Sequence, residues 1–204
     1  MKKTKQIIFI IFATVLLIVI GSLYTSVYAV TPTFWGACSR GVCVYYYIEN
    51  GTSNYFYQQI KNAAYNWEHT GHGLNPIYLY EKSSSSGTAM DFFAKPASFW
   101  GTNGSSIDGQ TSMRNSSGVE VNPEASNWLY SEIYLNSTLM SSSRYTDAIK
   151  QGVTAHEMGH AFGLKHYIYY DYARSLLYPY TFSTNNLRSL VVTAEDNEAI
   201  NAKY

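Results

Sequence analysis

The chain has 204 residues, and its 14 basic and 14 acidic side chains give a formal net charge of zero at neutral pH. Three of the lysines lie in an N-terminal segment that we expect to be removed, and without them the balance falls to about three negative charges. This mild acidity argues against nucleic acid or an anionic membrane surface as a partner. The remaining chain is long enough for a single domain with a buried core.

The first 29 residues are predicted to be a signal peptide. A lysine-rich start, typical of bacteria, precedes an apolar run over residues 7–20, and small residues at positions 27 and 29 form a signal-peptidase site. Cleavage would leave residues 30–204 as one secreted domain without stable membrane association. Alternatively, residues 7–23 stay in place as an anchor, because this stretch is nearly long enough to span a bilayer. In both cases the domain lies outside the cytoplasm.

The next feature is a pair of cysteines, Cys38 and Cys43, and the chain has no others. In an exported protein two cysteines so close together are predicted to form a small disulfide loop. A pair of free thiols is the alternative.

Strand and helix patterns follow in turn. Aromatic and β-branched residues predict strands over 42–48, 77–80, 88–94 and 128–135, with one short strand near 111–114. After the first strand, Ser53 can begin a helix whose apolar residues recur on one face until Gly71 ends it. His69 and His72 flank this glycine, and as histidines at a helix end they are expected to be solvated.

A second long helix is predicted to begin at Thr146 or Ser143 and to carry the most informative motif of the chain. Residues 156–166 read HEMGHAFGLKH and fit the pattern H-E-x-x-H-x-x-G-x-x-H at every specified position. The same helix has a face of small residues that suits close packing against a sheet: Ala148, Gly152, Ala155 and Gly159.

The spacing of this motif suits metal coordination. His156 and His160 lie one turn apart on the same helix face, so both imidazoles can reach one ion. Gly163 can end the helix in a backbone conformation that other residues avoid, and the chain then turns so that His166 supplies a third nitrogen. Three protein ligands leave the fourth tetrahedral position of Zn²⁺ open for water, and Glu157 can take the proton from that water.

The motif resembles the signature of the metzincin metallopeptidases. Downstream of it, residues 175–179 resemble the turn beneath the metal in the matrixin branch, with Leu177 where that branch has methionine. The resemblance implies that Leu177 packs beneath the metal. It also implies that Tyr178 and Pro179 line the pocket for the side chain that follows the scissile bond.

Residues 193–204 resemble the matrixin C-terminal helix, and Thr193 with Asp196 can form a capping box at its start. The order of elements predicts an α+β fold, in which a twisted mixed sheet is combined with a zinc-bearing helix, a backing helix and a C-terminal helix. The metzincin resemblance implies the same architecture. It also implies that a peptide substrate pairs with the edge strand of the sheet, which we place within residues 105–115.

The sequence therefore predicts a monomeric zinc endopeptidase that cleaves proteins or peptides and has no nucleic acid partner. Between His72 and His156 the chain has no histidine, so the second, structural zinc of matrixins is expected to be missing, and calcium is left open. Two alternatives remain open: a cell-surface module that binds zinc without turnover, and a zinc amidase that acts on non-peptide amides such as cell-wall material.

Overall fold

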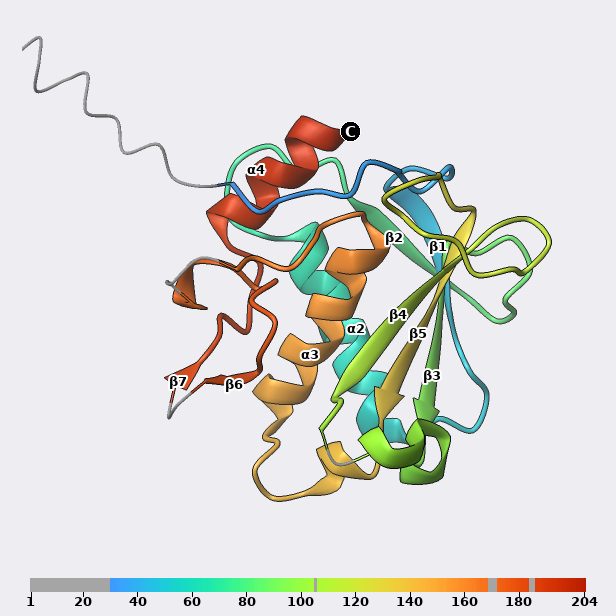
Figure 1. Ribbon diagram of the computed structural model, residues 1–204, viewed down its shortest axis with the longest axis vertical. Coiled ribbons are helices and arrows are strands. Elements are labelled where there is room, and N and C mark those ends of the chain that lie inside the picture. Colours follow the sequence, from blue (N-terminus) through green and yellow to red (C-terminus); the bar gives the residue numbers. More distant parts are fainter. Residues whose placement is uncertain (1–29, 105, 169–171, 184–185) are drawn as a thin grey trace, which may run out of the picture.

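The computed structural model describes residues 30–104, 106–168, 172–183 and 186–204 (Figure 1). The predicted signal peptide or anchor, residues 1–29, lies outside these ranges. Within them, no helix is both long and apolar enough to cross a lipid bilayer.

A five-stranded mixed sheet forms one layer of the fold, in the spatial order β2-β1-β3-β5-β4 (Figure 1). Its strands are β1 (Cys43–Ile48), β2 (Tyr78–Lys82), β3 (Met90–Lys95), β4 (Gly109–Arg114) and β5 (Tyr130–Asn136). The first three and β5 run parallel to one another, whereas β4 is antiparallel to β5 and forms one edge of the sheet. All five predicted strands are present, and the predicted position of the edge strand is confirmed.

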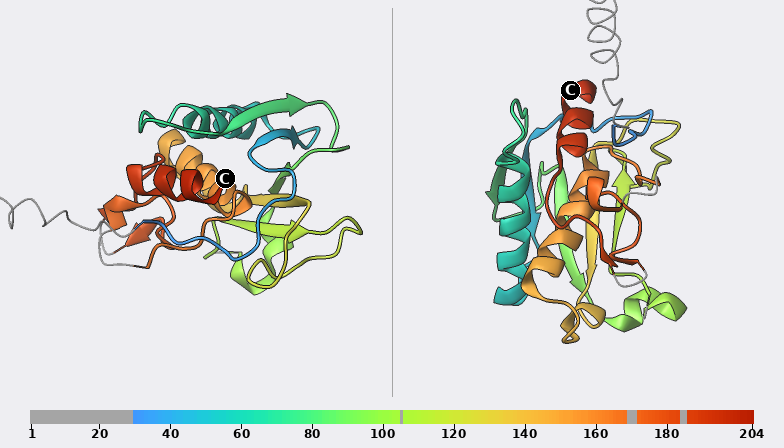
Figure 2. Two further views of the ribbon diagram at one scale, coloured as in Figure 1. Left: turned by 90° about the horizontal axis from the view of Figure 1, so that it is seen from above. Right: turned by 90° about the vertical axis from the view of Figure 1, so that its left-hand side faces the viewer.

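Two long helices, α2 (Asn54–Glu68) and α3 (Asp147–Ala161), lie side by side on one face of this sheet (Figure 2). They are joined by a hydrogen bond of 2.8 Å that the indole of Trp67 in α2 donates to the backbone carbonyl of Ala155 in α3. A third helix, α4 (Ala194–Lys203), follows near the C-terminus. The architecture is the predicted α+β and is consistent with a metzincin-like fold.

The starts of these helices follow the local capping chemistry. The side chain of Thr146 accepts a hydrogen bond from a backbone N–H of the first turn of α3, so Thr146 rather than Ser143 opens this helix. Thr193 and Asp196 form the predicted capping box at the start of α4. Ser53 occupies the N-cap position of α2, but its side chain makes no capping hydrogen bond.

The small-residue face of α3 packs differently from the prediction. A Cβ atom on Gly152 would lie 2.7 Å from the side chain of Leu190, and one on Gly159 would lie 2.9 Å from that of Leu177. Both leucines belong to the segment between α3 and α4, and Ala155 meets α2. The expected contact with the sheet was wrong, because periodicity describes the composition of a helix face and not the element that covers it.

Several short elements gave no periodic pattern in the sequence. They are the 3₁₀ helices η1 (Ala97–Asn103), η2 (Leu139–Ser141) and η3 (Tyr172–Arg174), and the paired strands β6 (Phe182–Ser183) and β7 (Asn186–Leu187). The strand pair lies on the side of α3 that faces away from the sheet (Figure 1).

The predicted disulfide is not formed in this structure, in which both cysteines are free thiols. Cys38 is buried and directs its sulfur at the carbonyl oxygen of Leu129, 3.8 Å away, whereas Cys43 is exposed at the start of β1. One side chain enters the core and the other faces solvent, so the alternative of two free thiols describes this structure.

Candidate metal centre

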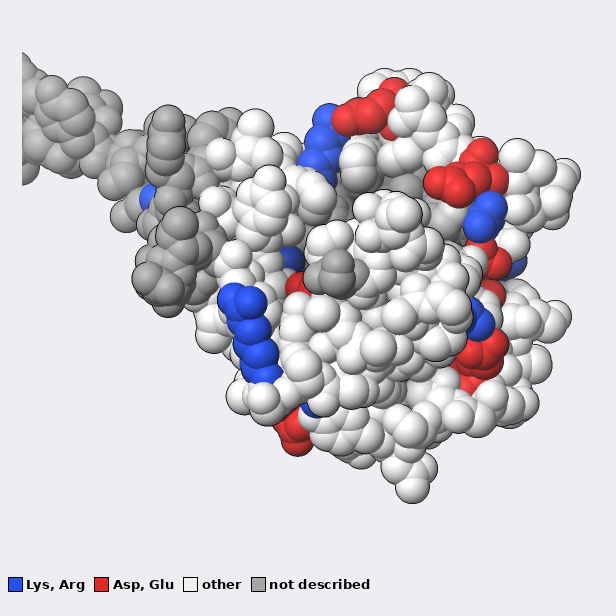
Figure 3. Space-filling view, turned by 60° about the horizontal axis from the view of Figure 1, so that its bottom comes forward, with Lys and Arg blue, Asp and Glu red and all other residues white. Residues whose placement is uncertain are grey.

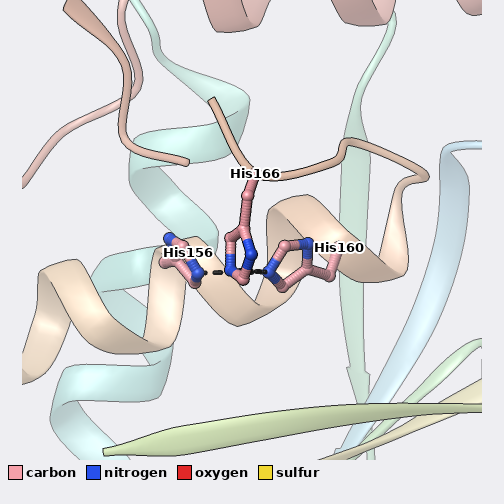
Figure 4. A group of neighbouring side chains, drawn as sticks. All are labelled: His156, His160 and His166. Carbon is pink, nitrogen blue, oxygen red and sulfur yellow. Dashed lines mark hydrogen bonds between the residues drawn. The ribbon is translucent and has the colours of Figure 1, made fainter. Parts of the chain in front are cut away.

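The three motif histidines converge at the end of α3 (Figure 4). His156 and His160 project from successive turns of this helix. Gly163 follows with a φ of 96°, a left-handed conformation that favours glycine and lets the chain turn back with His166. Nε2 of His160 lies 3.1 Å from Nε2 of His156 and 3.2 Å from Nε2 of His166. The three side chains could therefore hold one metal ion.

The spacing of these nitrogens fits a tetrahedral metal site. With metal–nitrogen bonds of about 2.0–2.1 Å, two ligands of a tetrahedral ion lie about 3.3 Å apart. The two measured Nε2 separations are close to this value. No carboxylate is needed to complete the triad, and an all-nitrogen donor set favours a transition metal over calcium or magnesium.

Backbone carbonyls orient two of the imidazoles. Nδ1 of His156 donates to the carbonyl oxygen of Leu176, and Nδ1 of His160 donates to that of Leu164, each at 2.8 Å. Because Nδ1 carries the proton in both rings, Nε2 is left with a free lone pair that faces the centre of the triad.

The Leu176 peptide is held in turn by Asp196 of α4. The backbone N–H of Leu176 donates to Oδ2 of this buried carboxylate at 2.9 Å, while Ser175 and Thr31 donate their hydroxyls to Oδ1 at 2.6 Å. Asp196 therefore positions the carbonyl that orients His156, although it touches none of the imidazoles itself.

Burial lowers the pKa of the two helical imidazoles. For His156 burial is the main cause, and the positive charge of Arg188 adds to it, so the pKa falls well below its ordinary value. Burial, followed by the charge of His166, lowers the pKa of His160 to about 3. Both rings are therefore neutral at physiological pH, which is the form that binds a divalent cation.

Glu157 lies between the triad and the edge strand. Its side chain is buried, and Oε2 accepts a hydrogen bond of 2.8 Å from the hydroxyl of Thr111 in β4. Gly109, at the start of β4, is so close that a Cβ atom there would lie 2.9 Å from Cγ of Glu157. Burial raises the pKa of Glu157 to about 7, against the opposing effect of the Thr111 hydrogen bond. A carboxyl group of this kind can take up and return a proton near neutral pH.

A cleft runs along β4 past these residues. It consists of two cavities that share Gly109, Glu157 and His166. The first, here called the Arg188 cavity, has a volume of about 400 Å³ and begins where β4 starts. The second, here called the β4 cavity, has a volume of about 540 Å³ and follows β4 as far as Met113. Another cavity of about 560 Å³, at the start of α2, contains none of the predicted site residues.

The triad, the adjacent glutamate and the cleft agree with what comparison with known proteins finds. Residues 140–187 match the family model of Peptidase M66. The Peptidase M66 match covers the whole triad and Glu157, so this similarity and the geometry both support a metallopeptidase-type function. Among curated proteins no match is found. The finer resemblance to the matrixin branch stays a prediction.

The residues predicted to form the turn beneath the metal and the pocket lie in the segment that follows the triad, which the Peptidase M66 match also covers. Leu177 is fully buried and packs against Gly159 of α3, on the helix that carries His156 and His160. Pro179 lines the Arg188 cavity. Tyr178 contributes its carbonyl oxygen, which accepts a hydrogen bond from Arg188.

Four residues at or near this site were not predicted: Gly109, Thr111, Arg188 and Asp196 as a positioning residue. Each reaches the site through a contact distant in sequence. The capping box marks Asp196 and the predicted edge strand includes Gly109 and Thr111, but neither pattern indicates a contact with the site. His69 and His72 lie outside the triad and are exposed, as expected.

Proposed function

We propose that the protein is a secreted, monomeric zinc endopeptidase that hydrolyses peptide bonds in proteins or peptides. The observation that carries this proposal is the convergence of three Nε2 atoms beside the buried Glu157, in a cleft that runs along an edge strand. The Peptidase M66 match supports the class of reaction.

His156, His160 and His166 would hold the zinc ion. When bound, Zn²⁺ supplies a Lewis acid that polarises a carbonyl and makes water a nucleophile at neutral pH. Zinc is favoured because three neutral imidazoles, two of them oriented by backbone carbonyls, form a nitrogen donor set of the right spacing.

Glu157 would move the proton. Its carboxylate takes a proton from the attacking water and then returns it to the leaving amine. The hydroxyl of Thr111 holds Oε2 during both steps, so that Oε1 is the oxygen that exchanges the proton. The backbone of β4 lies at the edge of the sheet and would pair with an extended substrate, as peptides do when they add a strand to an exposed sheet edge.

The proposal is tested with the exported protein, purified from the medium of an expressing host. We expect one zinc ion per chain by elemental analysis, and cleavage of a mixed peptide library that stops on addition of a chelator and returns with Zn²⁺. Absence of any transition metal after zinc supplementation would remove the basis of the proposal.

Two sets of variants separate metal binding from proton transfer. His156→Ala, His160→Ala and His166→Ala should each lower zinc occupancy, whereas His69→Ala is the matched control and should not. Glu157→Ala should keep zinc and fold but lose most turnover, while Glu198→Ala, at an exposed position of α4, should retain it. Zinc bound without cleavage of any peptide would favour the binding module or the non-peptide amidase instead.

A further inference from the structure

The Arg188 cavity is lined in part by a buried cation, Arg188 itself. Arg188 is only 4% exposed, yet no carboxylate in the described part of the chain lies within ion-pair distance of its guanidinium. Nη1 donates to the carbonyl oxygen of Tyr178 at 3.1 Å, and Nε is buried without a hydrogen-bond partner among the described residues. A buried arginine is normally paired, because an uncompensated charge costs several kcal/mol in the interior.

The nearby acids do not pair with this charge. The carboxylate of Asp108 accepts a hydrogen bond from the hydroxyl of Tyr145, and that of Glu157 accepts one from Thr111. Both acids act on Arg188 only through their longer-range fields, and burial still lowers the pKa of Arg188 to about 10. The guanidinium is therefore charged at neutral pH and has donors left over for an anion.

The remaining walls of the cavity suit a short side chain with an acidic end. Val153, Leu139 and Phe182 line it with apolar surface. Glu157 and two histidines of the triad, His156 and His166, also line it. The guanidinium of Arg144 stacks 3.6 Å above the Phe182 ring, so a second positive charge stands at this wall. The molecular face drawn in Figure 3 is largely without charged side chains, and those along its right-hand edge include acidic and basic residues close together.

The position of the cavity relative to β4 indicates which substrate residue would enter it. A peptide paired antiparallel with β4 runs from Met113 towards Gly109, and its scissile bond would lie beside Glu157, which Gly109 contacts. The residues before that bond then follow the β4 cavity. The residue after it reaches the Arg188 cavity.

We propose that the Arg188 cavity binds a carboxylate, that of an aspartate or glutamate directly after the scissile bond, and that Arg188 is the residue that selects it. This specificity rests on the proposed peptidase function. The substrate carboxylate would occupy the free donors of the guanidinium, with the directional geometry that makes arginine a selective carboxylate receptor. Binding of the correct substrate would thus supply the counter-charge that Arg188 lacks among the residues that the structure describes.

The test uses the zinc-loaded, exported protein and peptides that differ only in the residue after the cleaved bond: Glu, Gln, Lys or Leu. We expect kcat/KM for Glu to exceed that for Gln by at least about tenfold, since a site built to bind a polar group discriminates strongly against analogues that lack it. In Arg188→Gln this ratio should fall to about one while cleavage of the Gln peptide persists. Arg188→Lys should keep part of the preference, and Arg40→Gln, at an exposed arginine, is the matched control.

A binding measurement separates this proposal from the proposed peptidase function. The same four sequences with a reduced, non-hydrolysable bond are titrated into the wild-type protein by calorimetry, so that selectivity is measured even if no peptide is cleaved. Tighter binding of the Glu peptide, lost in Arg188→Gln, supports the proposal. Equal affinity for Glu and Gln, or a preference unchanged in Arg188→Gln, overturns it.

A last pair of peptides distinguishes the source of the carboxylate. Each ends at the residue after the non-hydrolysable bond and carries either a free C-terminal carboxylate or an amide. If the free acid and the amide of the Glu peptide bind alike, the side chain is the group recognised. A preference that follows the terminal carboxylate instead would overturn the assignment to an acidic side chain.

Discussion

Gly109 and Glu157 approach so closely that a methyl group on the glycine would lie 2.9 Å from Cγ and 3.0 Å from Oε1 of the glutamate. The contact joins the first residue of the edge strand to the carboxylate that follows the first histidine of the triad. Glycine at position 109 is favoured by the space that the Glu157 side chain occupies and not by a left-handed backbone, since Gly109 is not among the glycines with positive φ.

Gly109→Ala should for this reason damage turnover more than stability. The glutamate can swing aside to relieve the overlap, but it then leaves the position from which it exchanges a proton. We expect kcat/KM to fall at least about tenfold, which corresponds to roughly 1.4 kcal/mol of transition-state stabilisation, with zinc content and melting temperature nearly unchanged. A variant with the wild-type rate would show that Glu157 tolerates a range of positions.

The hydroxyl of Thr111 gives a second prediction. It is the hydrogen-bond donor to Oε2 of Glu157 and also lies 2.9 Å from the backbone carbonyl of the same residue. Thr111→Val keeps the shape but removes the donor, and hydrogen bonds to charged groups contribute about 1.5–3 kcal/mol. We expect kcat to fall about tenfold in Thr111→Val and to recover in Thr111→Ser, as measured by steady-state kinetics. Equal rates for the two variants would argue against a positioning role.

Substitutions at Leu177 test the predicted turn beneath the metal. It is fully buried against Gly159, and leucine and methionine have similar volumes, so Leu177→Met should cost less than about 1.5 kcal/mol and leave zinc binding intact. Leu177→Asp should reduce both stability and zinc occupancy, because it buries an unpaired charge. Urea unfolding and elemental analysis measure the two effects. Normal stability of the aspartate variant would contradict the packing seen here.

Asp91 predicts a pH dependence of stability that has no connection with the site. Burial on β3 raises its pKa from 3.8 to about 6, although Thr88 donates a hydrogen bond to it. Because the folded state holds the proton more tightly, the contribution of this group to stability is complete below about pH 4 and is lost as the pH rises through about 6. Asparagine does not ionise, so Asp91→Asn should avoid roughly 2 kcal/mol of this loss in the free energy of unfolding. The stability of the variant relative to wild type should therefore increase between pH 4.5 and 7.5. Parallel stability curves for the two proteins would refute the assignment.

The sequence predicts those parts of the molecule whose causes are local. Strand β1 is a run of aromatic and β-branched residues, the caps at Thr146 and Thr193 are set by neighbouring residues, and the triad is encoded within a single helical turn and loop. Arg188 could not be assigned, because its environment is built by segments that converge only in the folded chain. The prediction that the small-residue face of α3 packs against the sheet was wrong for the same reason. Helix periodicity carries no information about which element covers a helix face.

The carboxylate of Asp196 links the two ends of the chain to the metal-binding motif, so the order in which these segments are synthesised matters for the motif. It receives hydrogen bonds from Thr31, 165 residues earlier in the chain, and from the peptide that orients His156. The histidines leave the ribosome before α4 does, so a nascent chain carries the whole metal-binding motif without the carboxylate that holds the Leu176 peptide. All three histidines can then be present some time before the carbonyl that orients His156 is fixed. The site becomes ordered only when Thr31 and α4 have met.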